Sequence, residues 1–112
     1  MSCSLYAKYI NEREGLEEIK RKWGFLHYRI DGEECFISDY FVAEPFRGSG
    51  LGYDMADEAE EIAKEKDCKY MTCQVDMHAF NPEQSLCAII KHGYKIINIE
   101  NNRTIKLYKE LI

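Results

Sequence analysis

Three glycines at alternate positions mark the stretch of this chain with the clearest chemical potential, Arg47-Gly48-Ser49-Gly50-Leu51-Gly52. Glycine carries no Cβ, so the backbone N–H groups of such a loop can crowd around an anion. The arginine adds a permanently charged fork of donors beside them. A helical pattern that begins at Tyr53 contributes further free N–H groups and the positive end of its dipole. This combination predicts a phosphate or pyrophosphate site.

Two common phosphate loops do not fit this stretch. A Walker loop ends in Gly-Lys-Ser/Thr, whereas this loop ends in Gly-Tyr-Asp. The dinucleotide fingerprint requires a glycine at its last place, where this chain has a tyrosine or a methionine, depending on the glycine from which the motif is read. The pattern that fits is Arg-x-x-Gly-x-Gly, with Val42 five residues before Arg47.

The whole segment Val42–Gly52 resembles the acyl-coenzyme-A-binding motif of the GNAT N-acetyltransferase superfamily. Two later features agree with it, because Asn81 opens a helical segment and the pair Gly93-Tyr94 closes it. The resemblance extends from Phe25 to the C-terminus. It implies an α+β fold (three-layer α/β) in which a mixed, mostly antiparallel central sheet carries helices on both faces. The N-terminal part departs from the family, whose members usually carry two helices between the first strands.

The resemblance implies acetyl-CoA as the cosubstrate and gives several residues a role in binding it. The backbone of Phe41 and Val42 would pair with the pantetheine arm, with the N–H of Val42 directed at the thioester oxygen. Asn81 would hold the arm from the other side. The pyrophosphate would be held by the loop residues Arg47, Gly48, Ser49, Gly50, Leu51 and Gly52. We expect no metal, since neither His78 nor His92 pairs with a cysteine at ligand spacing.

Acetyl transfer to an amine also requires proton transfer. The tyrosine that protonates the leaving thiolate in many family members corresponds to Ile89 here, although a thiolate of pKa ~8.5 can leave without a dedicated acid. The carboxylate base of several members falls near Phe36. Substitute bases are Asp76 and His78, which follow the strand expected to separate from the motif strand, and Asp39 on the motif strand itself. Strict alternation places Asp39 on the face opposite Phe36. A surface histidine and structural carboxylates are the alternative interpretations.

Apolar spacing, turn residues and helix-ending residues predict the elements. We expect a strand over Ser4–Glu12, a helix over Gly15–Trp23, strands over Phe25–Ile30 and Glu34–Val42, a helix from Gly52 to about Lys66, a strand over Lys69–Asp76, a helix from Asn81 to His92, and a hairpin of Tyr94–Ile99 and Thr104–Leu111. Asp31-Gly32 predicts a tight turn between two strands. We expect residues 1–112 to form one domain.

Composition narrows the class of protein. Apolar residues make up 46% and charged residues 31%, which is a normal balance for a globular protein. We expect a cytoplasmic protein without a membrane span, because no apolar run approaches ~20 residues and the N-terminus resembles no signal peptide. The net charge of −5 argues against nucleic acid and suits a cationic acceptor. Five cysteines form no C-x-x-C pair, and Cys35, Cys73 and Cys87 fall inside apolar patterns typical of buried, reduced thiols.

The leading hypothesis is an enzyme that transfers an acetyl group from acetyl-CoA to a primary amine of a small molecule or protein, by direct attack. The alternative is a non-catalytic acyl-CoA-binding or protein-interaction module, which Ile89 and Phe36 favour. A third hypothesis, an unrelated α+β interaction domain, requires an accidental motif match. The shortened N-terminal part also suggests a homodimer in which a second copy completes the site.

Overall fold

The computed structural model describes residues 5–47, 51–77 and 82–111. These residues form helices and strands in the following order: α1 (Leu5–Glu14), β1 (Glu17–Arg21), β2 (Gly24–Asp31), β3 (Glu34–Val42), the short 3-10 turn η1 (Glu44–Phe46), α2 (Leu51–Glu65), β4 (Tyr70–Asp76), α3 (Pro82–Lys91), β5 (Lys95–Glu100) and β6 (Thr104–Glu110). No described helix is long and apolar enough to cross a lipid bilayer.

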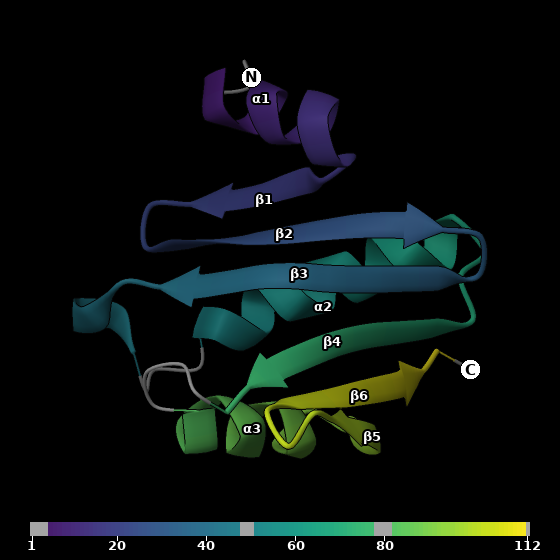
Figure 1. The fold of residues 1–112 in the computed structure, drawn as a ribbon. Coiled ribbons are helices and arrows are strands. Elements are labelled where there is room, and N and C mark those ends of the chain that lie inside the picture. Colours follow the sequence, from purple (N-terminus) through teal and green to yellow (C-terminus); the bar gives the residue numbers. More distant parts are fainter. Residues whose placement is uncertain (1–4, 48–50, 78–81, 112) are drawn as a thin grey trace.

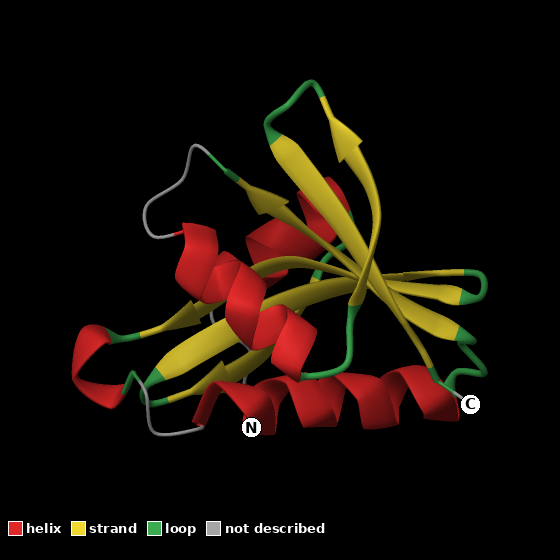
Figure 2. Ribbon diagram, turned by 90° about the horizontal axis from the view of Figure 1, so that it is seen from below, coloured by secondary structure: helices red, strands yellow, loops and turns green. Residues whose placement is uncertain are grey.

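The six strands form a single twisted sheet in the order β1-β2-β3-β4-β6-β5 (Figures 1 and 2). β3 and β4 run parallel, and the other four neighbouring pairs run antiparallel. A parallel pair needs a long crossover between its strands, and α2 supplies it. The predicted mixed, mostly antiparallel sheet is confirmed.

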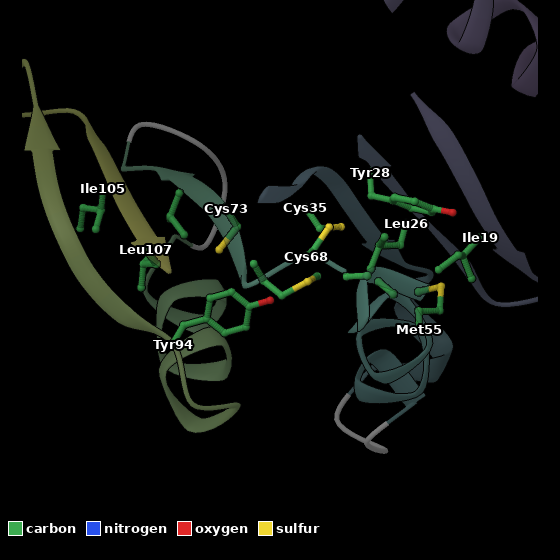
Figure 3. Packing of buried hydrophobic residues seen from close by; sticks show 14 residues of the cluster. Ile19, Leu26, Tyr28, Cys35, Met55, Cys68, Cys73, Tyr94, Ile105 and Leu107 are labelled. Carbon is green, nitrogen blue, oxygen red and sulfur yellow. The ribbon is translucent and has the colours of Figure 1, made fainter. Parts of the chain in front are cut away.

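The main hydrophobic core lies between one face of this sheet and the helices α2 and α3. Figure 3 shows Met55 of α2 and Tyr94, which follows α3, between the sheet and the two helices. Met55, Ala59 and Ala63 lie on one stripe of α2 and are fully buried, as the helical spacing predicts. We call this side of the sheet the helix face and the opposite side the far face.

α1 packs against the far face near the β1 edge of the sheet (Figure 1). The ring of Tyr6 on α1 lies 5.8 Å from the ring of His27 on β2, and Ile10 of the same helix is buried. His27 and Leu26 are consecutive residues of β2, so their side chains point to opposite faces. Leu26 belongs to the main core, which places His27 and α1 on the far face. Helices on both faces are therefore confirmed.

The two predictions for the N-terminus are wrong. Residues predicted as a first strand form α1, and residues predicted as a short helix form β1. Leu16, Ile19 and Trp23 have helical spacing, but only Ile19 lies inside a strand, where it pairs with Leu26. Leu16 precedes the strand and Trp23 belongs to the turn after it. Tertiary pairing with β2 therefore decides the structure of this segment.

From β2 onward the predicted elements are confirmed with small shifts at their ends. The predicted turn at Asp31-Gly32 joins β2 to β3, with Gly32 in a left-handed conformation (φ +63°). Cys35 and Cys73 are buried as expected, whereas the expectation for Cys87 is wrong. Cys87 points away from the core on α3, because the neighbouring Leu86 packs against it instead.

Candidate active site

The two parallel strands separate halfway along their length. β3 and β4 pair from Glu34 to Ile37 and from Tyr70 to Cys73. β3 then continues to Val42 and β4 to Asp76, with no further pairing between them in the described register. The separation leaves the β4 side of the outer half of β3 open, as expected for the motif strand.

A cleft of about 400 Å³ occupies this opening and extends between α2 and α3. Its lining comes from both separated strands, from both helices and from the residue that follows α3: Ile37, Ser38, Asp39, Tyr40, Tyr53, Ala56, Cys73, Gln74, Val75, Asp76, Ala88, Ile89, His92 and Tyr94. Apolar walls with a few polar groups at the opening are typical of small-molecule and cofactor sites.

A β-bulge at Ser38 changes which face Asp39 occupies. Tyr28 pairs with Ile37, but His27 pairs with Asp39, so Ser38 is an extra residue on β3. Arg29 pairs with Phe36 and lies over its ring, and Arg29 and His27 share the far face. Asp39 therefore lies on the same face as Phe36. The prediction from strict alternation is wrong, because a bulge inserts one residue into the two-residue period.

Arg47 bends back over the end of the motif strand. Its Nε donates a hydrogen bond of 2.8 Å to the carbonyl oxygen of Val42, and its guanidinium lies 5.6 Å from the ring centroid of Phe41. These contacts hold the Arg47 side chain against the C-terminal end of β3, just before the segment that leads to α2. Residues 48–50 of the predicted cradle lie outside the described residues, and α2 begins at Leu51.

Of the other two predicted catalytic residues, the structure places Asp76 at the cleft and does not describe His78. Asp76 lies at the end of β4, lines the cleft and accepts two hydrogen bonds from Arg103, of 3.2 and 3.3 Å. His78 and Asn81 lie outside the described residues. α3 begins at Pro82, as the predicted helix start requires. The structure therefore brings Asp39 and Asp76 to the same cleft, on its two opposite strands.

Polar contacts join α2 and α3 at the outer wall of the cleft. The rings of Tyr53 and His92 stack at 5.2 Å, and His92 Nε2 lies 2.8 Å from Asp57 Oδ1. Glu60 lies 3.3 Å from the other ring nitrogen of His92. Asp57, Glu60 and His92 could offer ligands to a metal ion. However, Lys109 Nζ lies 2.8 Å from Glu60 and already supplies the local positive charge. These contacts connect α2 to the residue that follows α3.

The floor of the cleft is lined by the buried side chains of Cys73 and Tyr94. Burial raises the pKa of the Cys73 thiol to about 12, and it also raises the pKa of Tyr94. The hydroxyl of Tyr94 is buried and has no hydrogen-bond partner among the described residues. Burial, followed by the charge of Tyr53, raises the pKa of Tyr40 at the side of the cleft. All of these groups stay protonated near neutral pH.

Two polar residues beside the site were missed from the sequence. His27 and Glu18 lie on the far face next to Asp39, and both are nearly inaccessible to solvent. Glu18 falls in a segment predicted as a helix, and His27 follows two apolar residues in an otherwise ordinary strand. The alternation of β2 did contain a signal for a polar site on the far face. His27 follows the apolar Leu26, so its side chain lies on the other face of the sheet.

Comparison with known proteins agrees with this fold. The sequence profile described as "Acetyltransferase (GNAT) family" matches residues 9–94, which is most of the chain. The chain therefore belongs to the GNAT acetyltransferase family. No curated protein matches the sequence.

Several solved structures share the fold. The PaiA N-acetyltransferase of Thermoplasma acidophilum, in complex with coenzyme A, has a TM-score of 0.71 and 17% identity, over 79% of this chain and 53% of that one. The ribosomal-protein-S18-alanine N-acetyltransferase of Escherichia coli has a TM-score of 0.75 and 13% identity, over 99% of this chain and 79% of that one. Ard1 of Thermoplasma volcanium has a TM-score of 0.69 and 16% identity, over 80% and 64%. At these identities the likeness concerns the fold alone. The chain spans only about half of the PaiA structure.

Proposed function

We propose that this chain is an N-acetyltransferase that moves an acetyl group from acetyl-CoA to a primary amine by direct attack, without an acyl-enzyme. In this proposal residues 1–112 act as one domain. The observation that carries the proposal is the cleft of about 400 Å³ between the separated strands β3 and β4, next to Arg47 and the start of α2. The family to which the chain belongs supports the same chemistry.

The cosubstrate would lie along the open side of β3. Val42 lies beyond the last residue that pairs with β4, and its backbone groups face this open side, whereas the carbonyl oxygen of the neighbouring Phe41 faces Gly24 on β2. The pyrophosphate would meet Arg47, the glycine loop of residues 48–52 and the first turn of α2, where helix N–H groups favour an anion. Asn81 would hold the pantetheine arm from the α3 side. No metal has a role in this proposal.

The acceptor nitrogen must lose a proton as it attacks, and Asp39 is the base we favour. Asp39 is one of the residues that line the cleft, and its side chain lies on the far face and is 60% exposed, so an amine can reach it. Asp76 is engaged by Arg103, which makes it the second candidate, and His78 is the third. Ile89 lines the cleft in place of the family's tyrosine, and the hydroxyls of Tyr40 and Tyr53 are the nearby proton donors for the thiolate.

A non-catalytic acyl-CoA-binding module is the second candidate, and one observation favours it. The cleft wall presents Ile89 where many family members have an acid, and the far face presents Phe36 where several have a base. Such a module would bind acetyl-CoA and release no thiol.

The test has two stages, with purified protein. Acetyl-CoA should raise the melting temperature, and Arg47→Ala should weaken binding by about tenfold or more because a charge-assisted contact is lost. Arg13→Ala on α1 is the matched control and should bind like the wild type. Release of CoA thiol with a panel of primary amines then separates the two candidates. Absence of any stabilisation by acetyl-CoA would contradict both.

We also propose a cytoplasmic homodimer formed through β5. This edge strand exposes about half of the surface of Ile96, Ile97 and Ile99. Two copies can pair their β5 strands antiparallel about a twofold axis at the centre of the strand. Ile96 then lies opposite the partner's Ile99 on the same face, and Lys95 lies opposite the partner's Glu100. Sedimentation should show a dimer that Ile97→Lys disrupts. A monomer at all concentrations would contradict this interface.

A further inference from the structure

Three polar side chains form a line across the far face of the sheet, one from each of three neighbouring strands. They are Glu18 on β1, His27 on β2 and Asp39 on β3. His27 Nε2 lies 2.8 Å from Glu18 Oε2, and His27 Nδ1 lies 3.5 Å from Asp39 Oδ2. Asp39, at the outer end of this line, also lines the cleft on the helix face.

The two distances show which carboxylate is the closer partner of the imidazole. A charge-assisted N–H to carboxylate bond is normally about 2.7–2.9 Å long, which the contact with Glu18 satisfies. The contact with Asp39 is too long for a bond of that kind. A neutral imidazole has one N–H and one bare nitrogen. The relay proposed below uses the neutral tautomer in which Nε2–H donates to Glu18, and Nδ1 then accepts a proton from Asp39.

Burial protects this arrangement from solvent. His27 is only 2% exposed, because the ring of Phe25 stacks on it at 4.7 Å and Tyr6 of α1 covers it. The Glu18 side chain is 9% exposed. A buried histidine and carboxylate are costly unless they are paired, so the pair holds the ring in one orientation. A proton can reach His27 from solvent or substrate through Asp39, which is 60% exposed.

We propose that Glu18 and His27 are positioning residues for the acetyl transfer, and that His27 Nδ1 takes up, through Asp39, the proton that the acceptor amine loses. This rests on the proposed acetyltransferase function. α2 and α3 close the helix face, so a cationic amine approaches a thioester in the cleft from the far face. Asp39 on β3 and Asp76 on β4 are the carboxylates among the residues that line the cleft, and Asp76 is engaged by Arg103.

The cationic amine first loses one proton to Asp39, which passes it to His27 Nδ1, so that the nitrogen gains a free electron pair. The nitrogen then bonds to the thioester carbonyl carbon, the C–S bond breaks, and the thiolate leaves with the bond's electron pair. The second proton of the nitrogen goes to the leaving thiolate, which gives the neutral amide and the CoA thiol. Glu18 then stabilises the imidazolium, as a carboxylate orients and stabilises histidine in hydrolase triads. The charged or titratable groups of this face nearest to the relay include Lys20 on β1, Arg29 on β2 and Tyr6 on α1. The same face also carries Glu34 on β3, Asp76 on β4 and Lys106 on β6.

The experiment measures CoA thiol release by the full chain with acetyl-CoA and three amines as probes: n-butylamine, spermidine and a peptide with a free N-terminus. The variants are then compared on the amine with the highest turnover. His27→Gln places an amide near the position of Nε2, so it keeps a donor for Glu18 but has no basic nitrogen. We expect it to lower kcat about 100-fold, to leave KM for acetyl-CoA nearly unchanged, and to remove the acidic limb of the pH–rate profile. Lys20→Gln is the matched control on the same face and should behave like the wild type.

Each outcome of this experiment either supports or overturns the proposed relay. If the wild type turns over an amine and His27→Gln keeps kcat within about twofold, the relay is wrong. If His27→Gln fails to fold, Glu18→Gln takes its place: a fall in kcat of about tenfold with an unchanged melting temperature supports the relay, and an unchanged kcat overturns it. If acetyl-CoA stabilises the wild type but no amine is turned over, the enzymatic function fails first, and the relay fails with it.

Discussion

The two faces of the sheet were predicted with unequal success. On the helix face, the segment β3–loop–α2 has the boundaries, the buried stripe and the neighbouring strand that the sequence predicts. On the far face, the N-terminal helix and strand exchange places relative to the prediction, and a buried histidine lies where none was anticipated. The difference shows that local signals specify the helix face from β3 to α2, whereas the far face depends on contacts between distant residues.

The largest effect is expected from a cavity in the core of the helix face. Leu26 is completely buried and packs in the cluster that includes Met55. Leu26→Ala should lower the free energy of unfolding by about 2–5 kcal/mol, measured by urea denaturation. Leu5→Ala, at an exposed position on α1, is the control and should cost less than ~0.5 kcal/mol. Equal losses of stability in Leu26→Ala and Leu5→Ala would contradict the distinction between the helix-face core and the exposed surface of α1.

Gly24, at the start of β2, connects stability to the cosubstrate site. A Cβ at this position would lie 2.2 Å from the carbonyl oxygen of Phe41, so the motif strand would have to shift. We expect Gly24→Ala to cost about 1–3 kcal/mol and to weaken acetyl-CoA binding, measured by denaturation and calorimetry. Gly32→Ala has open space but a φ of +63°, so it should cost about 1 kcal/mol and leave acetyl-CoA affinity unchanged. Unchanged affinity in Gly24→Ala would contradict the proposed role of the Phe41–Val42 backbone.

The buried thiols make the helix-face core sensitive to alkali. Burial raises the pKa of Cys35 and of Cys73 from 9.0 to about 12. Their contribution to stability is complete below pH 9 and is lost as pH rises toward 12, because the unfolded chain ionises first. Above pH 9 the free energy of unfolding should fall by ~1.4 kcal/mol per pH unit for each thiol, and below pH 9 it should stay constant, measured by denaturation between pH 8 and about 11. Cys73→Ala should reduce this slope, whereas Cys87→Ala, at an exposed thiol, should not. A flat profile would contradict the burial of the Cys35 and Cys73 thiols in the folded chain.

The smallest effect is expected at the cleft floor. The hydroxyl of Tyr94 has no partner among the described residues, so removing it takes away an unsatisfied buried group. Tyr94→Phe should leave stability unchanged or raise it by up to about 1 kcal/mol in thermal denaturation without ligand. A clear loss of stability would show that the hydroxyl is bonded in solution.

The reasons for success and failure are physical. Gly32 and Pro45 act locally, so the ends of β2 and β3 followed from the residues at those places. The family motif fixed the position of α2 in the same way. The spacing of Leu16, Ile19 and Trp23 suits a helix or a hairpin, and only pairing with β2 decides between them. The bulge at Ser38 left no sign in the alternation, so the face of Asp39, and with it the neighbourhood of His27, could not be predicted.

The central claim is that acetyl-CoA binds in the cleft between the separated strands. It can be tested by titrating acetyl-CoA into the ¹⁵N-labelled chain and following the backbone amide resonances. We predict saturable, one-to-one shifts at Tyr40, Phe41, Val42 and the start of α2, with little change in α1 and β1. Shifts confined to α1 and β1, or no saturable shifts at all, would contradict the claim.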